Sequence, residues 1–229
     1  MRIIGYDNHR VAFRSELDHG VDPLGLPRAH GYATARPLAA RRAPDGEFEL
    51  DLAVTPAPPA EPARPEPAQQ DARPEQIAGP PVVRRRVAAY GLITSTRGLL
   101  ATEFSHLTGV PGQWGLAGGG IEDDEQPSAA VAREAYEETG QRVDVAELIA
   151  VGSGRRLGVT RQGELEDLHT VRLIYRGSCP DPIDPVIHDL DGTTSAARWL
   201  PLDRWTDVPW APRWAALIRS VLAPVRSHR

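Results

Sequence analysis

The sequence is poor in cysteine and in aromatic residues, and it has no long apolar run. Cys179 is the single cysteine among 229 residues, so the chain can form no internal disulfide, which favours a reducing compartment. Aromatic residues make up only 6% of the chain, although the hydrophobic content of 41% is enough for a packed core. No segment approaches the roughly 20 apolar residues of a membrane span, and residues 1–14 lack the apolar core of a signal peptide. We therefore expect a cytoplasmic protein.

Lysine is absent as well. All 26 basic residues are arginine, and 31 acidic residues leave a formal net charge of −5. A chain with this balance does not present a general surface for nucleic acid or for an anionic membrane. We therefore expect neither nucleic acid nor a membrane as a partner.

Composition separates the chain into three segments. Residues 56–81 are mostly Pro, Ala, Glu, Gln and Arg. Because proline lacks a backbone donor and fixes φ, we expect this segment to be an extended linker that builds no sheet. Residues 1–55 form an N-terminal extension, either small and β-rich or irregular, with strands predicted at 2–5, 10–13 and 47–54. This extension packs on the main domain or on a second subunit, and in the second case the strand at 47–54 could pair across a homodimer.

Residues 82–229 are long enough for a complete domain. Apolar and β-branched runs predict strands at 86–96, 98–104, 143–151, 170–176 and 197–200. A loop is predicted at 152–167, and a last helix is predicted from Pro212. Strands, helix, strands and helix with few βαβ units indicate an α+β fold with a mixed sheet.

The densest chemistry lies between residues 118 and 140. Three glycines at 118–120 precede an acidic run at 122–125, and Pro127 and Gly140 are suited to begin and end a helix predicted at 126–139. On that helix Glu134, Glu137 and Glu138 share one face. Like charges at this spacing destabilise a helix unless a cation neutralises them, and carboxylate oxygens suit Mg²⁺ or Mn²⁺. A solvated acidic helix face is the alternative, but it does not explain the glycines.

At these residues the sequence resembles the Nudix hydrolases, and the run Trp-Gly-Leu-Ala-Gly-Gly-Gly at 114–120 adds to the resemblance. It departs from the family pattern at Gln141, where an aliphatic residue is usual, at the small Ala135, and at Ala117, where proline is frequent. The resemblance implies an α/β/α sandwich with a mixed sheet between helices. It also implies hydrolysis of a diphosphate bond in a small nucleotide substrate, with Mg²⁺ or Mn²⁺ as cofactor.

Residue roles follow from this resemblance. The carbonyl of Gly118 and the carboxylates of Glu134, Glu137 and Glu138 are the expected metal ligands, with Glu134 also the expected base. Arg133 is expected to hold a catalytic carboxylate by a hydrogen bond, and Glu125 to orient the network. Two weaker expectations concern Arg155 and Arg156, placed on the predicted loop to reach substrate phosphates. A further carboxylate could come from several late positions: Glu164, Glu166, Asp167, Asp189 and Asp191.

The favoured substrate is a nucleoside diphosphate linked to another group. Two alternatives stay open. One is a pyrophosphatase that acts on nucleoside triphosphates or oxidised nucleotides, and the other is a nucleotide-sensing module that binds without turnover. Because every charged position of the motif is intact, and no helix-turn-helix pattern accompanies it, the sequence favours an enzyme.

Overall fold

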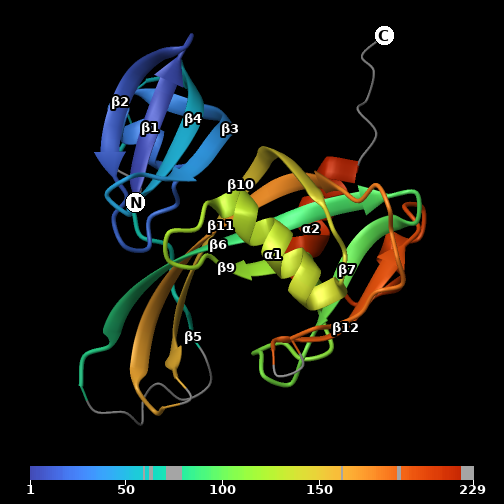
Figure 1. Ribbon diagram of the computed structural model, residues 1–229. Coiled ribbons are helices and arrows are strands. Elements are labelled where there is room, and N and C mark those ends of the chain that lie inside the picture. Colours follow the sequence, from blue (N-terminus) through green and yellow to red (C-terminus); the bar gives the residue numbers. More distant parts are fainter. Residues whose placement is uncertain (59, 62–63, 71–78, 161, 190–191, 223–229) are drawn as a thin grey trace. The chain divides into compact units, whose positions relative to one another are not determined.

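The computed structural model describes residues 1–58, 60–61, 64–70, 79–160, 162–189 and 192–222. Over these residues the chain forms two β-sheets, two α-helices and short 3-10 segments (Figure 1). It divides into two compact units, each made of three segments. The first contains Met1–Ala89, Gly120–Ala130 and Glu147–Tyr175, and the second contains Tyr90–Gly119, Val131–Ala146 and Arg176–Arg229.

The first unit begins with a small sheet, drawn in blue in Figure 1. Its strands are β1 (Arg2–Asp7), β2 (Arg10–Glu16), β3 (Tyr32–Arg42) and β4 (Phe48–Pro56), in the order β2-β1-β4-β3. The strands predicted at 2–5, 10–13 and 47–54 are confirmed, whereas β3 was not predicted. Its sequence is mostly alanine and arginine with an internal proline, so it carries little strand signal. It occupies an edge of the described sheet, where an internal proline is tolerated.

Alternation along β4 sorts its side chains between the two faces of this sheet. Leu50 and Leu52 are fully buried, together with Ile3 of β1. β4 pairs in parallel with β1 and antiparallel with β3, so both of its edges are occupied. The idea that this strand pairs across two subunits is therefore wrong.

The proline-rich segment is not wholly free of sheet structure. Gln69–Gln70 form the short strand β5, which pairs in parallel with Arg156 and Leu157 of β10 (Asp144–Val159). The prediction that the segment builds no sheet is wrong at these two residues, because glutamine keeps the backbone donor that proline lacks. Residues 59, 62–63 and 71–78 of the segment lie outside the described residues.

The second sheet has the strand order β12-β7-β6-β11-β10-β5 among the described residues, with β8 beside β7 and β9 beside β6. Its other strands are β6 (Val82–Ser95), β7 (Gly98–Phe104), β8 (Trp114–Gly115), β9 (Ala117–Gly120), β11 (Leu165–Ser178) and β12 (Thr194–Leu200). The strands β12 and β7 pair antiparallel, while β10 and β5 pair in parallel. The sheet is therefore mixed, as predicted.

The loop predicted at 152–167 is wrong over most of its length. β10 continues to Val159 and β11 begins at Leu165, so Arg155 and Arg156 lie on a strand. Glycine and charge gave this stretch the composition of a loop. Ion pairs between the two strands, Arg155 with Asp167 and Arg156 with Glu166, favour the extended hairpin over that local preference.

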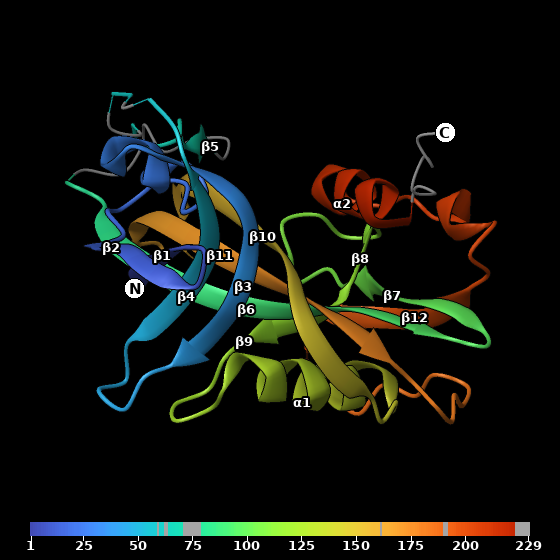
Figure 2. The same cartoon turned by 90° about the horizontal axis from the view of Figure 1, so that it is seen from above.

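The described residues form two α-helices: α1 (Pro127–Thr139) runs from the first unit into the second at Val131, and α2 (Pro212–Leu222) lies in the second unit. α1 begins one residue after its predicted start and ends where the sequence predicts, followed by Gly140 at a φ of 71°, and α2 begins at the predicted proline. Figure 2 shows α1 and α2 on opposite sides of β7 and β12. Ala135 of α1 packs in a buried cluster with Ile93, Leu100 and Ala117. This arrangement confirms the α+β sandwich. Among the described residues, no helix has both the length and the apolar character to cross a membrane.

Candidate active site

Glu138 is the most buried of the three helical carboxylates, with only 7% of its surface exposed. One oxygen, Oε2, accepts a hydrogen bond from the backbone N–H of Gly118 at 3.0 Å, and Oε1 accepts one from the hydroxyl of Thr194. Burial raises the pKa of Glu138 to about 8, against the lowering effect of these two hydrogen bonds, and the nearby charges of Glu134 and Asp189 raise it further. Within the described chain, the hydrogen-bond partners of this carboxylate are an amide and a hydroxyl.

The glycine run is shaped around the neighbouring carboxylate of Glu134. A Cβ at Gly119 would lie 2.6 Å from Oε1 of Glu134, so a side chain there would displace this carboxylate. Gly118 has a φ of 142°, in a region that L-residues rarely adopt. Gly118 is therefore favoured by its backbone conformation, and Gly119 leaves room for the Glu134 carboxylate in its present position.

Arg133 connects the other two carboxylates of the helix. Its Nη1 donates to Oε1 of Glu134 at 3.2 Å and to Oε2 of Glu137 at 2.9 Å. Glu137 is the most exposed of the three, with 40% of its side chain accessible. The predicted contact between Arg133 and a helical carboxylate is present, and it orients Glu134 and Glu137 together.

The carboxylates of α1 and the Gly118 carbonyl fit a hard divalent cation, although they do not form a complete coordination shell. In the described residues, no group of three or more His, Cys, Asp or Glu side chains is arranged to hold a metal ion. Mg²⁺ does not need such a group, because it keeps several waters and is usually bound by one or two carboxylates and the substrate phosphates. Among the described residues Glu138 has no cationic partner, and Glu134 lies against the same glycine run. A cation beside Gly118 would offset the cost of that buried charge.

The remaining predicted residues lie in the first unit, each with a partner. Oε2 of Glu125 accepts a hydrogen bond from the backbone N–H of Glu122 at 3.0 Å, so it closes the acidic turn after the glycines. Arg155 donates from Nε to Asp167 at 2.8 Å, and Arg156 donates from Nη2 to Glu166 at 3.2 Å.

The sequence did not assign two residues that interact with Glu138, namely Asp189 and Thr194. Asp189 was one of five late carboxylates that the sequence could not rank, and it acts on the charge of Glu138. Its backbone N–H donates to the carbonyl of Glu137 at 3.2 Å. Thr194 was not a candidate at all, because a lone threonine at the start of a strand carries no signal for a hydrogen bond to a distant glutamate. Asp191, another of the five, lies outside the described residues.

Comparisons with known proteins point to one protein family. A family model described as NUDIX domain matches residues 84–220. A MutT-like protein of Streptomyces ambofaciens is 38% identical over 88 residues, which are 38% of this chain and 53% of that protein. The matched part therefore spans about half the length of that relative. A nucleoside triphosphatase NudI of Enterobacter sp. (strain 638) is 30% identical over 96 residues, covering 41% of this chain and 68% of that protein.

Among solved structures, the chain is similar to a MutT NUDIX hydrolase from Burkholderia pseudomallei. The TM-score is 0.46 at 24% sequence identity, and the match covers 60% of this chain and 98% of that chain.

Proposed function

The chain belongs to the Nudix family, and we propose that it hydrolyses the diphosphate bond of a nucleoside diphosphate linked to another group. The observation that supports this most directly is the approach of two carboxylates to one glycine run. Glu138 accepts a hydrogen bond from the Gly118 amide, and Glu134 lies against Gly119. Acidic oxygens beside an unobstructed backbone suit a substrate that carries several phosphate charges, because a cation and phosphate oxygens can share the space.

We assign the residues the following roles. The Gly118 carbonyl and the carboxylates of Glu134, Glu137 and Glu138 would hold Mg²⁺ or Mn²⁺. The bound cation would act as a Lewis acid that neutralises charge on the phosphate oxygens. Glu134 accepts the proton of the attacking water, and Arg133 keeps its carboxylate oriented through the 3.2 Å hydrogen bond.

Residues outside the helix have supporting roles in this proposal. Glu125 fixes the turn that follows the glycines, through its 3.0 Å hydrogen bond with the Glu122 amide. Arg155 and Arg156 are assigned to substrate phosphates, and each would have to exchange its present carboxylate partner for a phosphate. Asp189 is the late carboxylate that we add to the site.

The reaction is tested with labelled water and a panel of diphosphates. Attack on phosphorus places ¹⁸O on a phosphate product, and a nucleoside diphosphate linked to a second group yields two phosphomonoesters. EDTA abolishes turnover, and Mg²⁺ or Mn²⁺ restores it. Turnover that persists without divalent metal, or label in a product without phosphate, would contradict the proposal.

A nucleoside triphosphatase is the second candidate, favoured by the name of the NudI relative that is 30% identical over 96 residues. Nucleoside triphosphates added to the panel separate the two candidates, because a triphosphate substrate releases either inorganic pyrophosphate or inorganic phosphate. A sensing module that binds nucleotide without turnover is rejected by metal-dependent hydrolysis of any compound in the panel.

We also propose that residues 82–229 form the catalytic domain, with 56–81 as its linker and 1–55 as its extension. The family match at 84–220 supports this division. A homodimer stays a prediction, which sedimentation equilibrium of the full chain would test.

A further inference from the structure

The hairpin of β3 and β4 ends in an arginine that is held firmly in place. Arg42 is the last residue of β3 and pairs with Phe48 of β4. Its guanidinium carbon lies 4.3 Å from the centre of the Phe48 ring, and its Nη1 donates to the carbonyl of Gly46 at 3.0 Å. The stacking on Phe48 and the hydrogen bond to Gly46 therefore fix the direction of the guanidinium within the hairpin.

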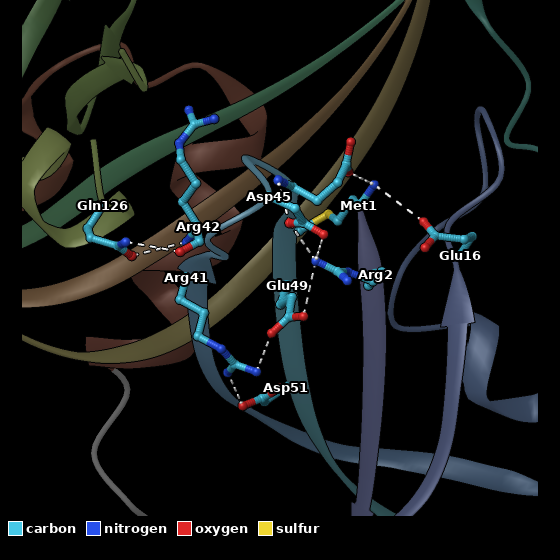
Figure 3. Close-up of polar contacts among 10 residues, drawn as sticks. Met1, Arg2, Glu16, Arg41, Arg42, Asp45, Glu49, Asp51 and Gln126 are labelled. Carbon is cyan, nitrogen blue, oxygen red and sulfur yellow. Dashed lines mark hydrogen bonds and ion pairs between the residues drawn. The ribbon is translucent and has the colours of Figure 1, made fainter. Parts of the chain in front are cut away.

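The rest of Arg42 binds the loop that leads into α1. Nη2 donates to the carbonyl of Glu122 at 2.9 Å, and Nε donates to the carbonyl of Glu125 at 3.2 Å. The backbone of Arg42 pairs with the side chain of Gln126, whose Oε1 accepts from the Arg42 N–H and whose Nε2 donates to the Arg42 carbonyl, both at 3.0 Å. Figure 3 shows this reciprocal pair between Arg42 and Gln126. All of these groups belong to the first unit.

The loop that Arg42 binds contains a residue in an unfavourable backbone conformation. Asp124 has a φ of 62°, which residues other than glycine seldom adopt. The Glu125 N–H donates to the Glu122 carbonyl at 3.3 Å, and the Glu122 N–H donates to the Glu125 carboxylate at 3.0 Å. Arg42 therefore binds the carbonyls at both ends of one tight turn, and Gln126 directly after it.

We propose that Arg42 is a positioning residue of the catalytic helix, although it lies outside the 84–220 family match. The turn that it binds connects β9 to the first residue of α1, and α1 carries Glu134, Glu137 and Glu138. A rigid helix transmits a displacement of its first turn to the carboxylates further along. Because misplacement of a reacting group by about 1 Å can cost about 10²-fold in rate, Arg42 sets turnover and cation affinity without touching substrate. This inference rests on the proposed hydrolase function.

The neighbouring residue supplies a matched control. Arg41 also lies on β3, but its guanidinium binds Glu49 and Asp51 of β4 within the same small sheet. Figure 3 shows Arg41 directed toward these two carboxylates, while the backbone of Arg42 faces Gln126. Arg41→Ala and Arg42→Ala each remove one guanidinium from the same strand, and only Arg42→Ala removes the side-chain hydrogen bonds to the Glu122 and Glu125 carbonyls, while the backbone pair with Gln126 remains.

Three properties of the full chain are measured for the wild type, Arg41→Ala, Arg42→Ala and Arg42→Lys. They are steady-state kinetics, Mn²⁺ affinity by electron paramagnetic resonance, and hydrogen exchange of the amides at 122–126. We expect Arg42→Ala to lower kcat and to weaken Mn²⁺ binding by about 10- to 100-fold, with KM changed far less. The amides of the turn exchange faster. Arg42→Lys is intermediate, because one ammonium cannot reproduce the two-carbonyl fork. Arg41→Ala matches the wild type in all three properties.

The result that would overturn the inference is a folded Arg42→Ala variant with wild-type kcat and wild-type Mn²⁺ affinity, even if its turn exchanges faster. Equal losses of kcat and Mn²⁺ affinity in Arg41→Ala would also overturn it, because both would then reflect damage to the small sheet. If the wild type hydrolyses no diphosphate, the proposed function fails, and Mn²⁺ affinity and exchange still decide the role of Arg42.

Discussion

Two buried carboxylates of this chain, one in each unit, have pKa values that are shifted in opposite directions. Glu138 is 7% exposed and Asp167 is 5% exposed, so their burial is nearly equal. Burial raises the pKa of Glu138 to about 8, whereas hydrogen bonds from Arg155 and, to a smaller degree, His19 lower the pKa of Asp167 to about 2. The two carboxylates differ in whether the chain supplies a cationic partner. Asp167 is paired with the guanidinium of Arg155, whereas the described partners of Glu138 are only an amide and a hydroxyl.

This comparison separates a structural ion pair from a ligand site. A buried charge without a counterion is costly, and one that is paired and hydrogen-bonded is tolerated. Asp167 therefore has its counterion within the chain, whereas an added cation would supply one for Glu138.

The largest effect is expected on turnover from the Glu134→Gln substitution. The amide keeps the shape of the side chain and removes the charge that accepts a proton, so kcat should fall by about 10²- to 10⁴-fold. Glu103→Gln is the control, because Glu103 is a half-buried residue of β7 whose carboxylate accepts a hydrogen bond from Ser195 at 3.2 Å. Near-normal turnover by folded Glu134→Gln would place the base on another residue.

The next effect concerns stability in mild acid and comes from His169, in the same strand as Asp167. His169 is 2% exposed, and burial lowers its pKa to about 4 with help from the charges of His19, Arg85 and Arg155. Because the unfolded chain binds this proton more tightly, the stabilisation is complete above about pH 6.5 and is lost as pH falls toward 4. The loss amounts to at most about 3 kcal/mol.

Urea denaturation at several values between pH 7 and pH 4 measures this loss. The His169→Gln variant should show a flatter profile over the same range. The contribution of Asp167 does not interfere, because its lowered pKa makes it lose stability only as pH falls from about 4 toward 2. Parallel profiles for the two proteins would contradict the prediction.

A pair of isosteric substitutions tests the comparison itself in metal-free protein. Glu138→Gln removes an uncompensated buried charge, and Asp167→Asn removes one that Arg155 compensates. At pH 9 we expect the first to raise the free energy of unfolding and the second to lower it, each by about 2 kcal/mol. Added Mg²⁺ should then raise the Tm of the wild type more than that of Glu138→Gln. Changes of the same sign in both variants would remove the distinction.

The parts of the fold that the sequence predicted have strong local signals. α1, which lies between the signals of Pro127 and Gly140, begins within one residue of its predicted start, and the strand at 98–104 has the predicted bounds. β3 lacked such a signal. The glycines and charges of β10 indicated a loop, but its ion pairs with β11 favour a strand. The three carboxylate candidates came from spacing along one helix, and Gly118 came from the family resemblance. Thr194 and Arg42 could not be predicted, and Asp189 could not be ranked among the late carboxylates, because each acts through contacts between residues far apart in the sequence.

The smallest effect is expected at Gln141, which stands where an aliphatic residue is usual for the family. It is 1% exposed, its Oε1 accepts from the Ile183 N–H at 3.0 Å, and its Nε2 donates to the Thr139 carbonyl at 3.0 Å. Gln141→Leu leaves the Ile183 N–H without its partner, so the free energy of unfolding should fall by about 1–2 kcal/mol. Gln113→Leu is the control, because Oε1 of Gln113 is buried with no hydrogen-bond partner among the described residues. Losing that oxygen should cost nothing, and equal losses in urea denaturation of both variants would show that side-chain volume, not hydrogen bonding, decides this position.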